Sequence, residues 1–380
     1  MARKSIATAC AALALALFSA GHAAAQGTTQ PWKLVSWSSS LGGQSVTYEI
    51  LYGLKAAMAF MNANGGVRGR ELSLYALEMD DENQDFRKSL DILMIQTKPD
   101  LVVGGASSWR AGSTAEYLQR VARPWFGPWT EDPDVYANRE DDPAGLLPTA
   151  TVQLRMLFAR AKAKMQPGKS LYFVFRDGPR VPRLSEEAHL AAMDAGIDLK
   201  PVRLSLYFRD WGSLRESFPG AGAVVLWLAP GPSAAIRRII GPLLGPDTIW
   251  MTHSLNPPGH ELMSLTGGLW SGTLFPAILT ASSEIPEAYS TVLNKYALPG
   301  LRLGYQSYLG FTQGQLLFKA IDQAGARRQA TPGGILRALK DTPSSGTLFA
   351  GKKLPSGPAD PAGVYLAEAD PLGGWRRAAP

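Results

Sequence analysis

Cysteine is almost absent from this sequence, which has one cysteine and four histidines among 380 residues. The single cysteine, Cys10, lies in an N-terminal leader segment, so the rest of the chain has no thiol. This excludes a disulfide framework and thiolate chemistry in the mature chain. Apolar residues make up 46% and charged residues 18% of the sequence, which is typical of a globular protein stabilised by its apolar core.

The sequence also lacks an apolar run of membrane-spanning length near its start. The run at residues 11–20 is too short for a membrane helix, which needs about 20 residues. Two basic residues precede the run and Ala23-Ala24-Ala25 follows it. The pattern predicts a secretory signal peptide over residues 1–25, cleaved before Gln26, and therefore a periplasmic protein. The alternative is an uncleaved membrane anchor.

No dense cluster of lysine and arginine is present. Removing residues 1–25 leaves 36 basic and 32 acidic residues, a net charge of 36 − 32 = +4. Nucleic-acid binding needs a much stronger basic patch, so we expect no nucleic-acid partner.

Enzyme motifs are missing as well. The three histidines outside the signal peptide are His189, His253 and His260, and the last two flank Pro257-Pro258-Gly259, which is not a helical spacing for metal ligands. The sequence has no Gly-x-Ser-x-Gly elbow and no Walker-type phosphate loop. We therefore expect no catalytic residue, no metal and no cofactor, and the protein is not predicted to be an enzyme.

What the sequence does contain is a clear helix–turn–strand unit between Gln44 and Phe86. Apolar residues recur every three or four positions from Val46 to Met61, which predicts a helix. Asn64-Gly65-Gly66 ends it, because glycine readily adopts the left-handed conformation found at helix ends. A strand over 71–78 and an acidic loop follow.

Strands and helices then alternate along the chain. This order predicts an α/β fold of two doubly wound parallel-sheet lobes, with a crossing at residues 138–148. The later part is expected to be mostly helical, with one strand-like run near the C-terminus. The strands are expected at residues 33–37, 71–78, 101–103, 125–126, 171–175, 202–206, 223–228, 248–251, 269–275 and 363–367, and the later helices at 86–94, 113–121, 184–195, 233–240, 305–325 and from 331 onward.

Four motifs in the right order resemble a known family. They are residues 62–70 with the acidic pair 80–81, residues 102–108, residues 127–133 and residues 305–307. Together they resemble the type I periplasmic solute-binding proteins of ABC importers, in particular the branched-chain amino-acid binding group.

The resemblance implies two lobes joined by a three-segment hinge, with a ligand enclosed between them. One lobe would be 31–148 plus 277–349, and the other 149–276 plus 350–380. The implied function is to capture a small molecule by hinge closure and deliver it, as a monomer, to the membrane subunits of an ABC importer. The alternatives are a periplasmic sensory protein of the same fold and an extracytoplasmic enzyme.

The resemblance also points to ligand-binding residues at strand ends in the first lobe. Ser38 and Ser39 follow the first strand. Ser107 and Ser108 follow another, where the family offers amides and hydroxyls to a ligand carboxylate, although a helix N-cap serine would look the same. Trp109 lies beside them.

Residues 129–131 take the place of a small residue and a hydroxyl in the family. Thr130 can still donate a hydrogen bond. Glu131 stands where the family usually has a hydroxyl residue, and its carboxylate would favour a cation or a hydroxyl donor of the ligand. The alternative is that Glu131 is a solvated loop carboxylate. Trp129 and Trp109 could stack on a ligand or could be partly buried against the lobe.

The second lobe offers two more candidates. His253 follows the strand at 248–251 and could line the opposite wall, although a lone histidine is more often structural. Arg176 lies at the exit of the strand at 171–175.

Three departures from the family concern the ligand. Val46-Thr47 replaces an aromatic–Gly pair, residues 176–182 lack a Tyr-Gly, and Leu255 or a near neighbour replaces the acid that binds an amino-acid ammonium. These departures favour a small carboxylate, an aromatic or alcohol-derived compound, or an amide over an α-amino acid.

Overall fold

The computed structural model describes most of the chain. The described residues are 30–38, 46–79, 85–105, 111–135, 145–178, 181–256, 260–296, 303–328, 330–342, 347–349 and 363–379. The predicted signal peptide therefore lies outside the described residues, as do Ser39, Ser107, Ser108 and Trp109.

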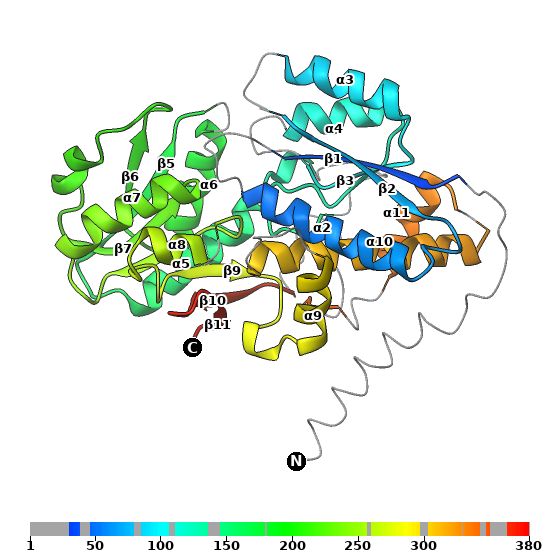
Figure 1. The fold of residues 1–380 in the computed structure, drawn as a ribbon. Coiled ribbons are helices and arrows are strands. Elements are labelled where there is room, and N and C mark those ends of the chain that lie inside the picture. The colour runs from blue at the N-terminus through cyan, green and yellow to red at the C-terminus, as the bar shows by residue number, and fades with distance from the viewer. Residues whose placement is uncertain are drawn as a thin grey trace.

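The first sheet is parallel throughout and has the strand order β2-β1-β3-β4 (Figure 1). Its strands confirm the four expected from the sequence in this part of the chain. They are β1 (Trp32–Ser38), β2 (Leu72–Glu78), β3 (Leu101–Val103) and β4 (Trp125–Phe126).

The second sheet has seven strands in the order β11-β10-β9-β8-β7-β5-β6. The five strands from β9 to β6 are parallel, which confirms the expected parallel-sheet lobe, and β10 and β11 add an antiparallel pair at one edge. The strands are β5 (Ser170–Arg176), β6 (Leu199–Leu204), β7 (Ala221–Trp227), β8 (Ile249–Thr252), β9 (Leu274–Ala277), β10 (Tyr365–Ala369) and β11 (Trp375–Arg377).

Two strands start three or more residues away from their expected positions. The strand expected at 202–206 starts at Leu199 and includes Pro201, which is tolerated because β6 is an edge strand. The strand expected at 269–275 begins only at Leu274, because Gly272 has a φ of 79° and makes a turn that an extended strand cannot contain.

Helices cover both faces of both sheets. In the first lobe, α2 and α10 pack on one face of the sheet and α3 and α4 on the other. In the second lobe, α5 and α6 pack on one face, and α7 and α8 on the other. The helices are α2 (Val46–Ala63), α3 (Phe86–Thr97), α4 (Ala111–Arg120), α5 (Ala150–Lys164), α6 (Val181–Ala195), α7 (Pro230–Ile240), α8 (His260–Leu265), α9 (Glu287–Tyr296), α10 (Tyr305–Ala326) and α11 (Pro332–Asp341).

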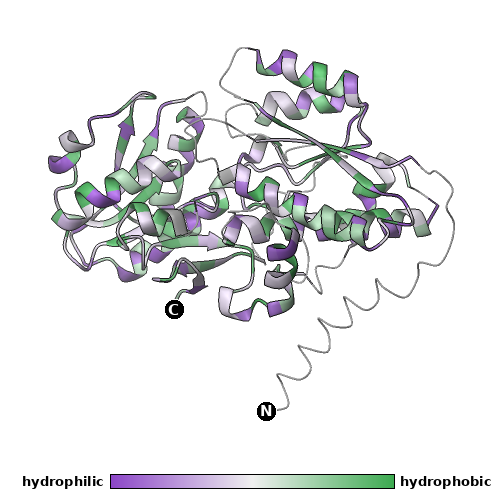
Figure 2. Ribbon diagram, in the orientation of Figure 1, coloured by the Kyte–Doolittle hydropathy of each residue, from purple (hydrophilic) through white to green (hydrophobic). Residues whose placement is uncertain are grey.

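Side-chain polarity follows these layers. Figure 2 shows hydrophobic residues along strands of the second sheet other than the edge strand β6, and a mixture of hydrophilic and hydrophobic residues on the helices. Among the helices described, none is both long enough and apolar enough to cross a membrane.

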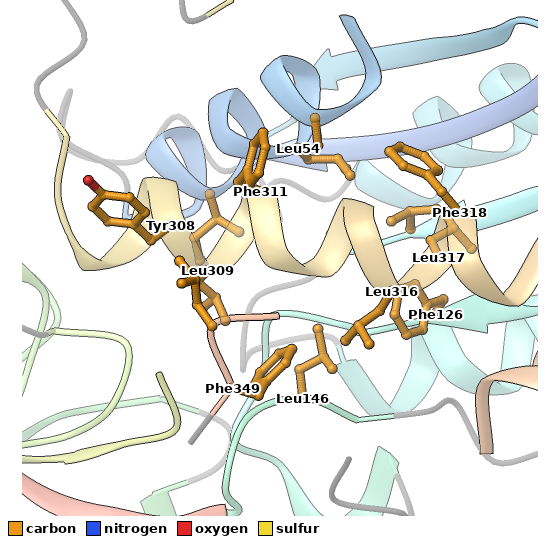
Figure 3. Close-up of a cluster of buried hydrophobic side chains, with 14 of the residues drawn as sticks. Leu54, Phe126, Leu146, Tyr308, Leu309, Phe311, Leu316, Leu317, Phe318 and Phe349 are labelled. Carbon is orange, nitrogen blue, oxygen red and sulfur yellow. The ribbon is translucent and has the colours of Figure 1, made fainter. Parts of the chain in front are cut away.

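The α2–α10 seam is the tightest helix contact of the first lobe, and its apolar cluster is drawn in Figure 3. A Cβ placed on Gly310 of α10 would lie 1.8 Å from the carbonyl oxygen of Ile50, and a Cβ on Gly53 of α2 would lie 2.0 Å from that of Ser307. The two backbones therefore touch, and only glycine fits at these two positions.

We expect Gly310→Ala to destabilise the protein by at least about 1–3 kcal/mol, because the added methyl group forces α2 and α10 apart. Urea unfolding measures this loss. Gly333→Ala in α11 is the matched control, since a Cβ there meets nothing within 4 Å. A Gly310→Ala protein as stable as this control would contradict the tight seam.

Candidate functional site

The carboxyl ends of strands from both sheets come together at one place. Glu131 follows β4 of the first sheet and His253 follows β8 of the second, and their side chains are in direct contact. Nearby, the chain passes from the first lobe to the second, and Ala150 N–H at the start of α5 donates to the carbonyl oxygen of Glu131 at 2.8 Å. Ligands in open parallel sheets bind beyond this edge of the strands. This junction is therefore the candidate site.

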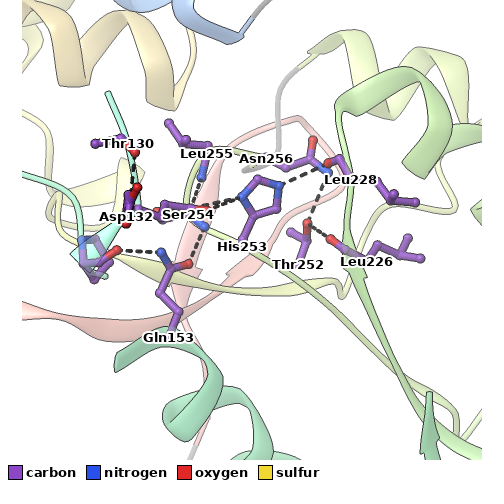
Figure 4. A network of polar contacts seen from close by, with 12 residues as sticks. Thr130, Asp132, Gln153, Leu226, Leu228, Thr252, His253, Ser254, Leu255 and Asn256 are labelled. Atoms are coloured by element: carbon purple, nitrogen blue, oxygen red, sulfur yellow. Dashed lines mark hydrogen bonds and ion pairs between the residues drawn. The ribbon is translucent and has the colours of Figure 1, made fainter. Parts of the chain in front are cut away.

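Glu131 and His253 form a buried ion pair across the lobes. Figure 4 shows His253 among its polar neighbours in the second lobe. Nδ1 of His253 lies 3.0 Å from each carboxylate oxygen of Glu131. The exposed fraction is 2% for Glu131 and 9% for His253, so neither group is solvated by bulk water. The ring of Trp227 stacks on the imidazole, with a centroid distance of 5.0 Å and an interplanar angle of 20°.

The partners of His253 indicate that its ring carries both protons. Nε2 lies 3.1 Å from the carbonyl oxygen of Leu228, which can only accept a hydrogen bond. Nδ1 faces the carboxyl group of Glu131, which only accepts when it is ionised, as its lowered pKa indicates. Both ring nitrogens must therefore donate, and the pair is an imidazolium with a carboxylate.

The pKa directions agree with a charged pair. Burial by itself would raise the pKa of Glu131, but the charge of His253 and hydrogen bonds from His253, Gln153 and Ser254 together lower it. Burial would likewise lower the pKa of His253, but the charge and hydrogen bond of Glu131 and the carbonyl of Leu228 raise it. Each partner thus keeps the other ionised.

Three further groups of the second lobe complete the network. Ser254 Oγ donates to Glu131 Oε1 at 2.9 Å, and the Leu255 N–H donates to the same oxygen at 3.2 Å. The Ser254 N–H donates to Oε1 of Gln153 at 2.8 Å, and Gln153 is fixed by donating to the carbonyl of Pro148 at 2.7 Å. The first turn of α5 therefore positions the loop after β8 against Glu131.

For Glu131, the interpretation as a solvated loop carboxylate is wrong, because its side chain is only 3% exposed. The cation that it binds in this structure is His253 of the same chain, not a ligand. Sequence reasoning named both residues but did not pair them, since 122 positions separate them along the chain.

Trp129 lies in the core of the first lobe and not on a ligand surface. It is 1% exposed, its ring packs on Gly104, and its Nε1–H donates to Gln313 of α10 at 2.8 Å. Gln313 in turn donates to the carbonyl oxygen of Gly127 at 3.0 Å. The stacking interpretation therefore fails for Trp129, because α10 holds its indole inside the lobe.

Of the remaining described candidates, Ser38 and Arg176 lie at strand ends and Thr130 lies in the loop after β4. Ser38 ends β1, is 1% exposed, and its Oγ has no hydrogen-bond partner in the described part of the chain. Thr130 is fully buried, and its Oγ1 accepts from the Asp132 N–H at 3.2 Å. Arg176 ends β5 and is half-buried, one residue beyond the Phe175–Trp227 strand pair.

Sequence reasoning missed four residues that build the site: Gln153, Trp227, Ser254 and Asn256. Helix α5, which carries Gln153, was not expected at all. The polar run from Thr252 to Asn256 was the available signal, because four of its five residues are polar and directly follow a buried strand. Within the described ranges, no group of three or more His, Cys, Asp or Glu is arranged to hold a metal ion.

The fold has many relatives among solved structures. A fatty acid ABC transporter substrate-binding protein from Thermomonospora curvata superposes with a TM-score of 0.75 at 15% identity, over 92% of each chain. A branched-chain amino acid ABC transporter protein from Thermus thermophilus with bound valine gives 0.75 at 16% identity, over 93% of this chain and 96% of the other. A periplasmic binding protein type 1 from Bordetella pertussis gives 0.68 at 15% identity, over 90% and 97%. At these identities the likeness concerns the fold.

Sequence comparison gives the family. No curated protein matches the chain by sequence. The family model described as "Periplasmic binding protein" matches residues 34–360, which is most of the chain. The chain therefore belongs to the type I periplasmic binding protein family.

Proposed function

We propose that this protein captures a small solute between its two lobes and delivers it to the membrane subunits of an ABC importer. The observation that carries the proposal is the contact of Glu131 with His253, which brings the carboxyl ends of β4 and β8 together. A solute bound beyond these edges would be contacted from both lobes, and hinge closure would enclose it. Members of the family are ligand-binding proteins of transport systems, and the proposal contains no catalytic step.

The proposal includes export and a two-lobe organisation. We take residues 1–25 as a signal peptide cleaved before Gln26 and the periplasm as the place of action. We take 31–148 plus 277–349 as one lobe and 149–276 plus 350–380 as the other. The pairing of β10 with β9 supports the return of the C-terminal segment to the second lobe.

The solute is proposed to be a small carboxylate, an aromatic or alcohol-derived compound, or an amide, in preference to an α-amino acid. An ammonium group removed from water needs a carboxylate partner. Glu131 follows β4 at the strand edge, but it already accepts from His253, Ser254 and Leu255. Candidate ligand contacts are Ser38, Ser39, Ser107, Ser108, Trp109 and Arg176.

Isothermal titration against leucine, valine, isovalerate, octanoate, benzoate, benzyl alcohol and benzamide tests this function. We expect at least one of the compounds that are not amino acids to bind with a Kd of about 1 μM or tighter, which corresponds to about −8 kcal/mol. Mass spectrometry of the protein purified from its native host identifies any solute it retains. Tight binding of leucine with no response to the other compounds would overturn the proposed solute class. If no compound binds and none co-purifies, solute capture itself is wrong.

A further inference from the structure

Asn256 holds a buried amide whose carbonyl oxygen has no donor. The residue lies in the loop after β8 and is completely buried. Its Oδ1 has no hydrogen-bond partner anywhere in the structure as described. A buried acceptor left without a donor costs about 1–3 kcal/mol. Such an atom in a folded protein needs an explanation, and a bound group that donates to it is one.

Two hydroxyl groups fix the orientation of this amide. Nδ2 of Asn256 lies 2.9 Å from Oγ of Ser233 and 3.1 Å from Oγ1 of Thr252. Thr252 donates its one hydroxyl proton to the carbonyl of Leu226, and Ser233 donates its own to that of Leu228. Both hydroxyls must therefore accept from Asn256. The nitrogen faces them, and Figure 4 shows the oxygen pointing away from Thr252.

The position of this oxygen matches a ligand site. Thr252 ends β8, and Ser233 lies in the first turns of α7, which follows β7. Asn256 therefore lies at the carboxyl ends of two neighbouring parallel strands, where sheets of this kind bind their ligands. The Asn256 N–H donates to the carbonyl of His253 at 3.0 Å, which places Asn256 one turn from the ion pair with Glu131.

The charge balance at this place favours an uncharged donor. His253 neutralises Glu131, and the hydroxyl and amide groups around Asn256 carry no charge. A neutral N–H or O–H loses less solvation on burial than an ammonium group and satisfies Oδ1 equally well.

We propose that Oδ1 of Asn256 accepts a hydrogen bond from an uncharged N–H or O–H group of the solute. Asn256 is then a specificity-determining residue that selects amides and alcohols over analogues without such a donor. The inference rests on the proposed function and names one chemical requirement of the solute. A site built to hydrogen-bond a substrate group rejects the analogue that lacks it, because its own polar atom is left unpaired.

Matched pairs of probes test this requirement by isothermal titration. The pairs are benzamide with N,N-dimethylbenzamide, isobutyramide with N,N-dimethylisobutyramide, and benzyl alcohol with benzyl methyl ether. We expect at least one donor-bearing probe to bind the wild-type protein about 10-fold or more tightly than its capped partner.

Asn256→Leu separates hydrogen bonding from steric exclusion. Leucine has nearly the same volume but no acceptor, so the preference should fall to about equal binding. A purely steric preference would persist in this variant. Gln315→Leu is the matched control, because Gln315 of α10 also has a buried oxygen without a partner but lies away from the strand ends, and this variant should keep the wild-type ratio.

A high-resolution crystal structure of the wild-type protein gives a second readout that needs no variant. The crystals contain the protein with the probe that binds most tightly or, if no probe binds, the protein as purified. A solute donor within about 3.2 Å of Oδ1 supports the proposal. A protein donor at Oδ1, or a water there with any solute bound elsewhere, overturns it. Equal binding of every probe pair by the wild type also overturns it, while leaving solute capture intact.

Discussion

Replacing Glu131 with alanine is expected to lower the free energy of unfolding by about 3–5 kcal/mol. The substitution leaves His253 buried without its counter-ion and removes the acceptor of Ser254 Oγ and of the Leu255 N–H. The contact joins two lobes, so part of the loss should appear as a weaker association of the loop after β8 with the first lobe. Urea unfolding followed by tryptophan fluorescence measures the change.

Glu131→Gln should lower the free energy of unfolding much less than Glu131→Ala does. A glutamine oxygen can still accept from Ser254 and Leu255, and its amide can donate to Nδ1 of a neutral His253. Glu368→Ala is the control for an exposed pair, since Glu368 bonds Arg376 at 2.9 Å on the surface between β10 and β11, and pairs of that kind contribute about 0–1 kcal/mol. Equal stability of the Glu131→Ala and Glu368→Ala proteins would refute the importance of the buried pair.

The stability of the wild-type protein is expected to fall as the pH rises above about 6.5, because the pKa of His253 is raised in the folded state. A histidine whose pKa is higher in the folded state than its ordinary 6.5 contributes stability below 6.5 and loses it as the pH passes the folded value. Glu131 has a lowered pKa, so its contribution is complete above its ordinary 4.5 and is lost as the pH falls through the folded value. The pair therefore stabilises most between about pH 4.5 and 6.5.

Thermal unfolding between pH 4 and 9 measures this dependence. His253→Gln should remove the decline on the alkaline side, because a glutamine does not titrate. His189→Gln is the matched control, since His189 is exposed on α6 and should leave the profile of the wild type unchanged. If the His253→Gln protein still loses stability at alkaline pH as the wild type does, another group must be responsible for that loss.

Most of the fold could be predicted because its signals are local. Apolar spacing in the stretch from Val46 to Met61 marks the helix α2, and glycines at 65 and 66, with φ of 91° and 73°, end it as expected. Short apolar runs bounded by turns mark β3, β4 and β5. The pairing of the edge strands β10 and β11 was harder to predict. Antiparallel pairing at the edge of a parallel sheet depends on where a segment distant in the sequence returns to that sheet.

The candidate site was less predictable, because its contacts join distant parts of the chain. The sequence alone determined that the protein is an α/β chain without disulfides and that polar residues follow its buried strands, since composition, periodicity and glycine positions are properties of neighbouring residues. Only the tertiary structure decided that Trp129 belongs to the core, that Glu131 is neutralised by His253, and that the oxygen of Asn256 is left without a donor. The physical reason is that burial and charge pairing depend on which segments pack together, and that packing joins residues more than 100 positions apart.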